Sequence, residues 1–168
     1  MLGGYPGSLY PGQYAPQAGG GASGASYSRT PTQFVRAASD ISSGNWVPST
    51  GGSLFGTIDE TPENDSDYDT SGIATASPDI MEVKFGTATL VPSTGYLIVR
   101  YAYGKNASGG DIVNLTVRLV QGTTVIASWS HADIPIGTTV ATQQLTAGQF
   151  AAITDFTDLR LRFEAVKG

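Results

Sequence analysis

The sequence predicts an all-β protein, an antiparallel β-sandwich of jelly-roll or Greek-key type with an extended N-terminal arm. From residue 53 onward, short β-branched and aromatic runs are separated by Gly, Pro, Ser, Asn and Asp, and helical periodicity is nearly absent. Several runs alternate apolar and polar side chains with period two, as strands with one buried face do. The first 28 residues hold no charged side chain but contain four of the eight tyrosines and eight of the 22 glycines.

The segment 1–38 is predicted to be an assembly arm, and residues 39–168 are predicted to form the sandwich domain. Glycine maximises backbone freedom and proline lacks an N–H donor, so the arm favours neither a steady helix nor a central strand. Its amphipathic side chains favour docking onto another chain, and these are Tyr5, Tyr10, Tyr14 and Tyr27. A flexible linker is the alternative interpretation. Fully extended, such an arm would reach on the order of 120 Å.

Composition narrows the classes of function. There is no cysteine, so neither disulfides nor thiolate metal sites support the fold. The chain shows no secretory leader and no run near the roughly 20 apolar residues that cross a bilayer, so we expect a protein made in the cytosol with no membrane partner. Net charge is −5 with nine Lys and Arg spread along the chain, which argues against nucleic acid as a partner.

Three segments alternate clearly enough to assign an inner face, namely 81–85, 111–120 and 159–165. The residues predicted to face the core are Met81, Val83 and Phe85, then Val113, Leu115, Val117 and Leu119, then Leu159, Leu161, Phe163 and Ala165. The opposite face of each segment carries mainly polar or charged side chains and is predicted to face water.

Two further strands are expected before the last corner of the chain. Segment 96–103 is apolar on both faces apart from Arg100, which predicts a central strand or one whose second face meets a neighbour. Segment 123–130 is predicted to follow a tight hairpin at Gln121-Gly122. Its inner face is predicted to carry Val125, Ala127 and Trp129.

The C-terminal third is predicted to contain one more strand and one short helix. Segment 137–146 is predicted to be the strand. Thr146 is predicted to be the N-cap of a single helical turn through Gln149 and Ala152. The segment Asp155-Phe156-Thr157-Asp158 is predicted to close the corner before the final strand.

The acidic residues are concentrated in one segment, because IDETPENDSDYDTSG holds six of the fourteen. Asp65, Asp67 and Asp69 have the every-second-residue spacing that begins a calcium loop. An EF-hand then requires Gly at the sixth position of the loop and a bidentate Glu at the twelfth. This chain has Thr70 and Ala76 at those two positions. The favoured interpretation is a solvated loop that opposes self-association or meets a basic partner, with an ion site as the alternative.

No catalytic or cofactor site is predicted. His131 is the single histidine, and Ser128 and Ser130 are near it only in sequence, so a triad is not indicated. The chain contains no nucleophile elbow, phosphate loop or metal-spaced histidine pair. We therefore expect a strand-end or surface histidine, no cofactor and no enzyme activity.

Three aromatic residues permit two interpretations. Trp46, Tyr101 and Tyr103 would suit a sugar-stacking platform, because flat aromatic faces match pyranose rings. Burial in the core explains them with fewer assumptions, as it does Trp129. Glycan binding is therefore kept as the lesser alternative.

The order of landmarks resembles small β-sandwich virion proteins of tailed bacteriophages. These landmarks are SSGNWVPSTGGSLFGTIDE, the Asp-rich loop, GYLIVRYAYGK, LTVRLVQGTTVIASW and LTAGQFAAITDFTDLRLRFEA. They extend from about Asp40 to Val166. The resemblance implies a structural subunit, since such domains serve as capsid decoration or cement proteins and as tail or fibre modules. No functional residue transfers individually from it.

The resulting hypothesis is a non-enzymatic decoration protein that clamps capsid subunits through its arm and sandwich edge. Its expected partners are the major capsid protein or other virion proteins and further copies of itself, and its expected location is the virion. The alternative is a tail or fibre module that binds host-surface glycan. A virion protein gains stability by burying surface against many copies, which suits a chain without disulfides.

Overall fold

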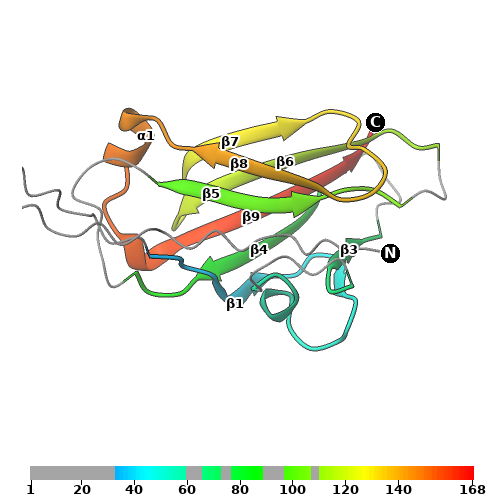
Figure 1. The fold of residues 1–168 in the computed structure, drawn as a ribbon, viewed down its shortest axis with the longest axis horizontal. Coiled ribbons are helices and arrows are strands. Elements are labelled where there is room, and N and C mark those ends of the chain that lie inside the picture. Colours follow the sequence, from blue (N-terminus) through cyan, green and yellow to red (C-terminus); the bar gives the residue numbers. More distant parts are fainter. Residues whose placement is uncertain (1–32, 60–65, 73–76, 89–96, 107–109) are drawn as a thin grey trace, which may run out of the picture. The chain divides into compact units, whose positions relative to one another are not determined.

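The computed structural model describes residues 33–59, 66–72, 77–88, 97–106 and 110–168. All lie within one compact unit, Pro31–Gly168. This unit is all-β with antiparallel strand pairing, which confirms the predicted fold class (Figure 1). The jelly-roll or Greek-key type remains a prediction. The four tyrosines of the arm lie outside the described residues.

The described part of the chain contains nine strands, β1 to β9, and three short helices that lie between strands. The strands are β1 (Ala37–Ser42), β2 (Trp46–Pro48), β3 (Asp69–Ser71), β4 (Asp79–Phe85), β5 (Ile98–Tyr103), β6 (Val113–Gln121), β7 (Thr124–His131), β8 (Thr139–Gln144) and β9 (Leu159–Lys167). The helices are the 3-10 turns η1 (Phe55–Thr57) and η2 (Phe156–Asp158) and the α-helix α1 (Ala147–Ala151).

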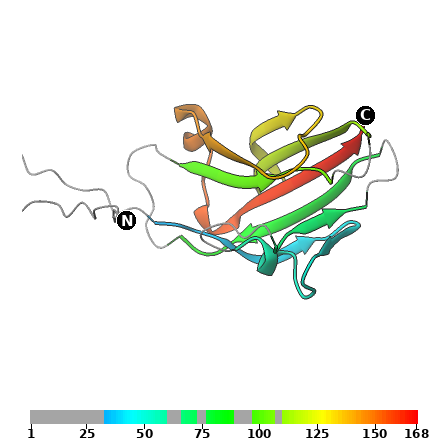
Figure 2. The same cartoon turned by 45° about the vertical axis from the view of Figure 1, so that its right-hand side comes forward.

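Five strands form the main sheet in the order β1-β4-β9-β6-β7, and β2-β3 and β5-β8 form two smaller sheets. Figures 1 and 2 show β5 and β8 lying over one face of the main sheet. Phe163 on β9 contacts both small sheets, through Trp46 of β2 at a ring distance of 6.4 Å and Tyr101 of β5 at 6.0 Å. The two small sheets therefore cover the same face of the main sheet.

The inner faces predicted for β4, β6 and β9 are largely confirmed. Val117 and Val83 are 0 % exposed and Phe163 is 6 % exposed. In β6 and β9 these residues are paired across the sheet, with Val117 opposite Phe163 and Leu115 opposite Ala165. Phe85 and Val113, at the strand ends, are half-buried and pack on the edge of the core.

The inner face predicted for β7 is wrong at its first residue. Val125 is 47 % exposed, whereas its neighbour Ile126 is 7 % exposed. The cause is a register shift in the β6-β7 pair, where Leu119 lies opposite Ala127 but Val120 lies opposite Val125. Such a bulge inserts one residue into a strand and reverses the alternation beyond it.

The hairpin between β6 and β7 is confirmed, with its turn one residue later than predicted. Gln121 pairs with Thr124, so the connecting residues are Gly122 and Thr123. Gly122 has a φ of 56°, in the left-handed region that glycine adopts without steric cost.

The cap predicted at the start of α1 is confirmed as a complete capping box. The Gln149 backbone N–H donates to Thr146 Oγ1 over 3.2 Å, and the Thr146 N–H donates to Gln149 Oε1 over 2.9 Å. At the next corner, the Thr157 N–H donates to Asp155 Oδ1 over 2.8 Å, which starts η2. Both short turns are thus specified by side chains close in sequence.

The central position predicted for the segment around β5 is wrong. Among the described strands β5 pairs with β8 alone, and Ile98 on its outer face is 56 % exposed. The inner residues Val99 and Tyr101 are buried as expected of a strand that covers a core. The second apolar face of β5 is therefore open to a neighbour rather than buried within the domain.

Candidate docking groove

A groove of about 940 Å³ lies between the two small sheets, above the inner face of the main sheet. One wall is formed by residues 67–71, which include β3, and the other by residues 100–106, which include β5. The floor includes Val83 of β4 and Leu161 and Phe163 of β9. The groove exists because the second layer consists of two short sheets that are not joined to each other through any described strand.

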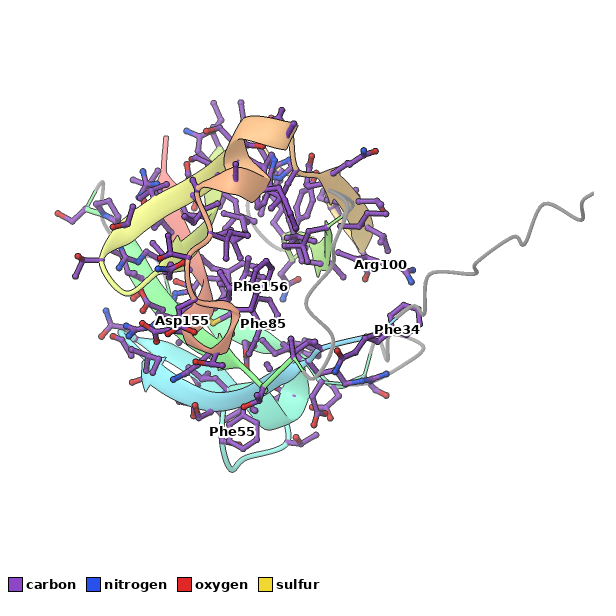
Figure 3. All side chains as sticks on the ribbon, turned by 90° about the vertical axis from the view of Figure 1, so that its left-hand side faces the viewer. Phe34, Phe55, Phe85, Arg100, Asp155 and Phe156 are labelled. Atoms are coloured by element: carbon purple, nitrogen blue, oxygen red, sulfur yellow. The ribbon has the colours of Figure 1, made fainter. Side chains whose placement is uncertain are left out.

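The side of the domain where the chain enters β1 also borders this groove. Val35 and Arg36 line it, and Phe34 just before them is 79 % exposed. Figure 3 shows Phe34 and Arg100 at the same side of the domain, whereas Phe85 and Phe156, which are half-buried and pack against the core, lie near the middle of this view. Residues 35 and 36, which precede β1, therefore lie at the groove.

The floor is aromatic near its centre. Phe163 is flanked by Trp46 and Tyr101, whose ring planes are inclined to it by 54° and 90°. Edge-to-face and tilted arrangements of this kind contribute about 0.5–1.5 kcal/mol per pair beyond the area that they bury. The centre of the floor is consequently an apolar surface in which neighbouring rings are packed together.

The β2-β3 wall is attached to the main sheet by Asp79 of β4. Asp79 is 7 % exposed, and its carboxylate accepts from the Asn45 N–H over 2.8 Å and from the Ser71 hydroxyl over 2.5 Å. Its backbone carbonyl accepts from Trp46 Nε1 over 3.2 Å. The wall thus has a defined position relative to the floor.

The turn before β2 fits closely against the same strand. Gly44 has a φ of 54°, and a Cβ atom there would lie 2.4 Å from the carbonyl oxygen of Ile80. A side chain would therefore meet both backbone strain and a collision with backbone.

The structure places two of the three aspartates of the acidic segment in the groove wall. The Asp67 carboxylate accepts from the Thr50 hydroxyl over 3.0 Å, just beyond the last pair of β2 and β3, and Asp69 accepts from the hydroxyl of Thr57. Asp65 lies outside the described residues. Within the part of the chain that the structure describes, no three His, Cys, Asp or Glu side chains gather as a metal site would require.

His131 lies at the end of β7 and contacts two tyrosines. The Tyr101 hydroxyl is 2.8 Å from His131 Nε2, and the Tyr103 ring centroid is 4.3 Å from that of His131. Burial raises the pKa of Tyr101 to about 12 and lowers the pKa of His131 below its usual value of 6.5. Both shifts favour the neutral pair, in which the tyrosine donates its proton to the hydrogen bond with the imidazole.

The three aromatic residues considered for a platform belong to one lining but come from the two different small sheets. Tyr101 is 7 % exposed and serves the core, whereas Trp46 and Tyr103 are half-buried. All three line the groove. A ligand in the groove would therefore reach partly exposed aromatic surface on both sides.

Sequence patterns did not predict the groove. Its walls depend on two strands, β3 and β5, that are far apart in the chain and are not hydrogen-bonded to each other. The one available signal was the apolar character of both faces of the segment around β5, which indicated a further contact without identifying where it would form.

Comparison of the chain with protein-family models, with curated proteins and with solved structures found no match. Among the described residues, no helix has the length and apolar character to span a membrane.

Proposed function

We propose that this protein is a non-enzymatic structural subunit of a tailed-bacteriophage virion, a decoration protein that binds capsid subunits through its arm and through the edges of its β-domain. The observation that carries the proposal is the groove, with strand edges for walls and an aromatic floor. Such edges bind extended chain segments by main-chain hydrogen bonds. The resemblance of its landmarks to phage sandwich proteins supports the same role.

The chemistry of the single histidine supports a structural role. His131 contacts Tyr101 and Tyr103, and the lowered histidine pKa and raised tyrosine pKa keep both partners neutral. A general base requires a reactive proton within its reach, and an activated tyrosine requires a depressed pKa. The pair has the character of a buried packing contact.

The direct test is the copy number and position of the protein in purified particles, measured by quantitative mass spectrometry and cryo-electron microscopy. Hundreds of copies on the shell are expected. A few copies at one vertex or on the tail would replace decoration by connection or receptor binding, and absence from particles would overturn the virion role.

The arm is tested by substitution rather than by deletion through residue 38, because Ala37 is 9 % exposed in the core and Val35 lines the groove. A variant with Tyr5, Tyr10, Tyr14 and Tyr27 changed to Ala should lose particle binding, and the matched Tyr→Phe variant should retain most of it, since the ring supplies the apolar contact. Full occupancy by the Ala variant would contradict the role of the arm.

A second candidate function is glycan binding by a tail or fibre module. Trp46 and Tyr103, half-buried in the groove lining, favour it. It predicts few copies per particle and a specific sugar that binds the wild type but not Tyr103→Ala. A silent glycan array together with hundreds of copies would dismiss it.

A further inference from the structure

We infer that the groove between β3 and β5 is the receptor for the N-terminal arm of a second copy of this chain, which enters as an added strand. This inference rests on the proposed function, because it names the partner that the assembly arm engages. The added strand would lie between β2-β3 and β5-β8 and unite them into one second layer.

The walls have the form that strand addition requires. Within the described residues β3 pairs with β2 and β5 pairs with β8, so each has its second edge directed at the groove. A strand edge presents N–H and C=O groups in alternation along its length. Because β5 has six residues, an added strand alongside it would extend for about 20 Å at roughly 3.3 Å per residue.

The floor would accept one face of that strand. In an extended segment successive side chains point to opposite faces, so every second side chain would meet the apolar floor around Phe163 and Leu161. The remaining side chains would point outward in line with Ile98 and Val140, which are already 56 % and 36 % exposed on the outer face of β5-β8. The outer face of β5, which includes Ile98, would then be part of the outer face of one continuous sheet.

The composition of the arm matches this receptor. Residues 1–28 carry no charged side chain, so this part of the arm would place no charged side chain over an apolar floor, where burial without a partner is costly. Prolines at 6, 11 and 16 lack N–H groups, which leaves 7–10 and 12–15 as stretches with every backbone donor. Each stretch contains one tyrosine, Tyr10 or Tyr14, whose ring can pack on the floor while its hydroxyl reaches water.

The length of the arm favours a second copy as the donor. The described chain begins at Gln33, and Val35 and Arg36 already line the groove. Filling the same domain's groove would need only a short return of the chain, whereas 32 residues extend to about 105 Å. An arm several times longer than the groove can reach a neighbouring copy and still fill its groove along the full length of β5.

Cysteine cross-linking of the full-length protein tests this, since the chain has no native cysteine. Donor copies carry one substitution in the arm, Tyr5→Cys, Tyr10→Cys or Tyr14→Cys, together with a mass tag. Acceptor copies carry Thr70→Cys or Ala102→Cys, both exposed residues in the groove walls. A disulfide forms where the Cα atoms approach within about 4.4–6.8 Å.

The matched control acceptor is Val125→Cys, which is 47 % exposed on β7 and does not line the groove. At least one arm position should give tagged–untagged disulfides with Thr70→Cys or Ala102→Cys on the order of tenfold above this control, because docking raises the local concentration of the thiol. Cross-linking of every arm position at the control level would overturn the inference.

A double variant, Tyr10→Cys with Ala102→Cys in one chain, separates the two possible donors. Disulfides between tagged and untagged copies that increase with protein concentration are expected. Disulfides that form mainly within one chain at all dilutions would show that the arm fills its own groove, and would overturn the inference. Far-ultraviolet circular dichroism of each variant confirms that exposed-site substitution has left the fold intact.

The inference and the proposed function fail separately. Abundant copies on the capsid with no arm-to-groove disulfide would retain decoration and remove the exchange between copies. Arm-to-groove disulfides in a protein that is absent from particles would retain the exchange and remove the virion role.

Discussion

The hydroxyl of Tyr101 lies 2.8 Å from Nε2 of His131 and joins β5 of the small sheet to the end of β7 in the main sheet. The two rings meet edge to face at 74°, and the Tyr103 ring lies 4.3 Å from the imidazole, centroid to centroid, at an angle of 34°. This contact links the two layers.

The stability of the domain is expected to fall as pH decreases through the range in which histidine titrates. The folded-state pKa of His131 is lowered by burial, so its contribution is fully present above the unfolded value of about 6.5 and is lost as pH falls toward the lower folded value. Urea unfolding at several pH values between about 7.5 and 5 measures this. In His131→Phe this part of the pH dependence should vanish, and an unchanged slope would show that other groups cause it.

The bulge in β7 predicts opposite outcomes for two adjacent residues. Ile126→Ala should lower the free energy of unfolding by about 2–4 kcal/mol, because it leaves a cavity beside the core. Val125→Ala should change the same quantity by no more than about 0.5 kcal/mol, since Val125 is largely exposed. Equal effects in chemical denaturation would mean that the regular alternation expected from sequence is present after all.

Glu82 is expected to be the most sensitive charged residue of the outer face. Its side chain is 5 % exposed and binds Arg160 at 3.1 Å and Arg162 at 2.7 Å. Glu82→Ala would remove the carboxylate bound to Arg162 and one of the two carboxylates bound to Arg160, which also pairs with Asp158, and should cost about 1.5–3 kcal/mol of stability. The control is Asp111→Ala, whose 59 %-exposed carboxylate pairs with Lys167 and should contribute less than about 1 kcal/mol. Comparable losses in the two variants would argue against the burial of Glu82.

The position of the β2-β3 wall is expected to depend on Asp79. Asp79→Ala removes the acceptors of the Asn45 N–H and the Ser71 hydroxyl, and should cost about 1–3 kcal/mol and speed amide exchange in β2 and β3. The matched control is Asp67→Ala at the opposite end of the β2-β3 pair, where the carboxylate bonds to an exposed hydroxyl and exchange in β4 should remain unchanged. Unaltered exchange in β2 and β3 of Asp79→Ala would refute this role.

Local patterns predicted much of the fold because they act over a few residues. The alternation around Val117 and Phe163 specified buried faces, and the spacing of Thr146 and Gln149 specified a capping box, since each depends on neighbours in sequence. The exposed position of Val125 was not predictable in the same way. A bulge arises from the way in which two strands pair, so it cannot be predicted from the alternation of residues within one strand.

The candidate site depended even more on tertiary structure. Asp67 and Asp69 read as an acidic loop, yet the fold uses both as hydrogen-bond acceptors for Thr50 and Thr57 and places them in a groove wall. Tyr101 and His131 are 30 positions apart, and nothing in either local sequence pairs them.

By itself the sequence determined the all-β class, the inner faces of β4, β6 and β9, the α1 cap, and an uncharged tyrosine-bearing segment at the N-terminus. These features follow from backbone preference and from the period of side-chain burial, which are properties of contiguous residues. Only the tertiary structure decided that the second layer is divided into two short sheets with a groove between β3 and β5. The physical reason is that strand pairing and layer packing are chosen by contacts between distant segments, whose free energies depend on register and on what each edge meets in space.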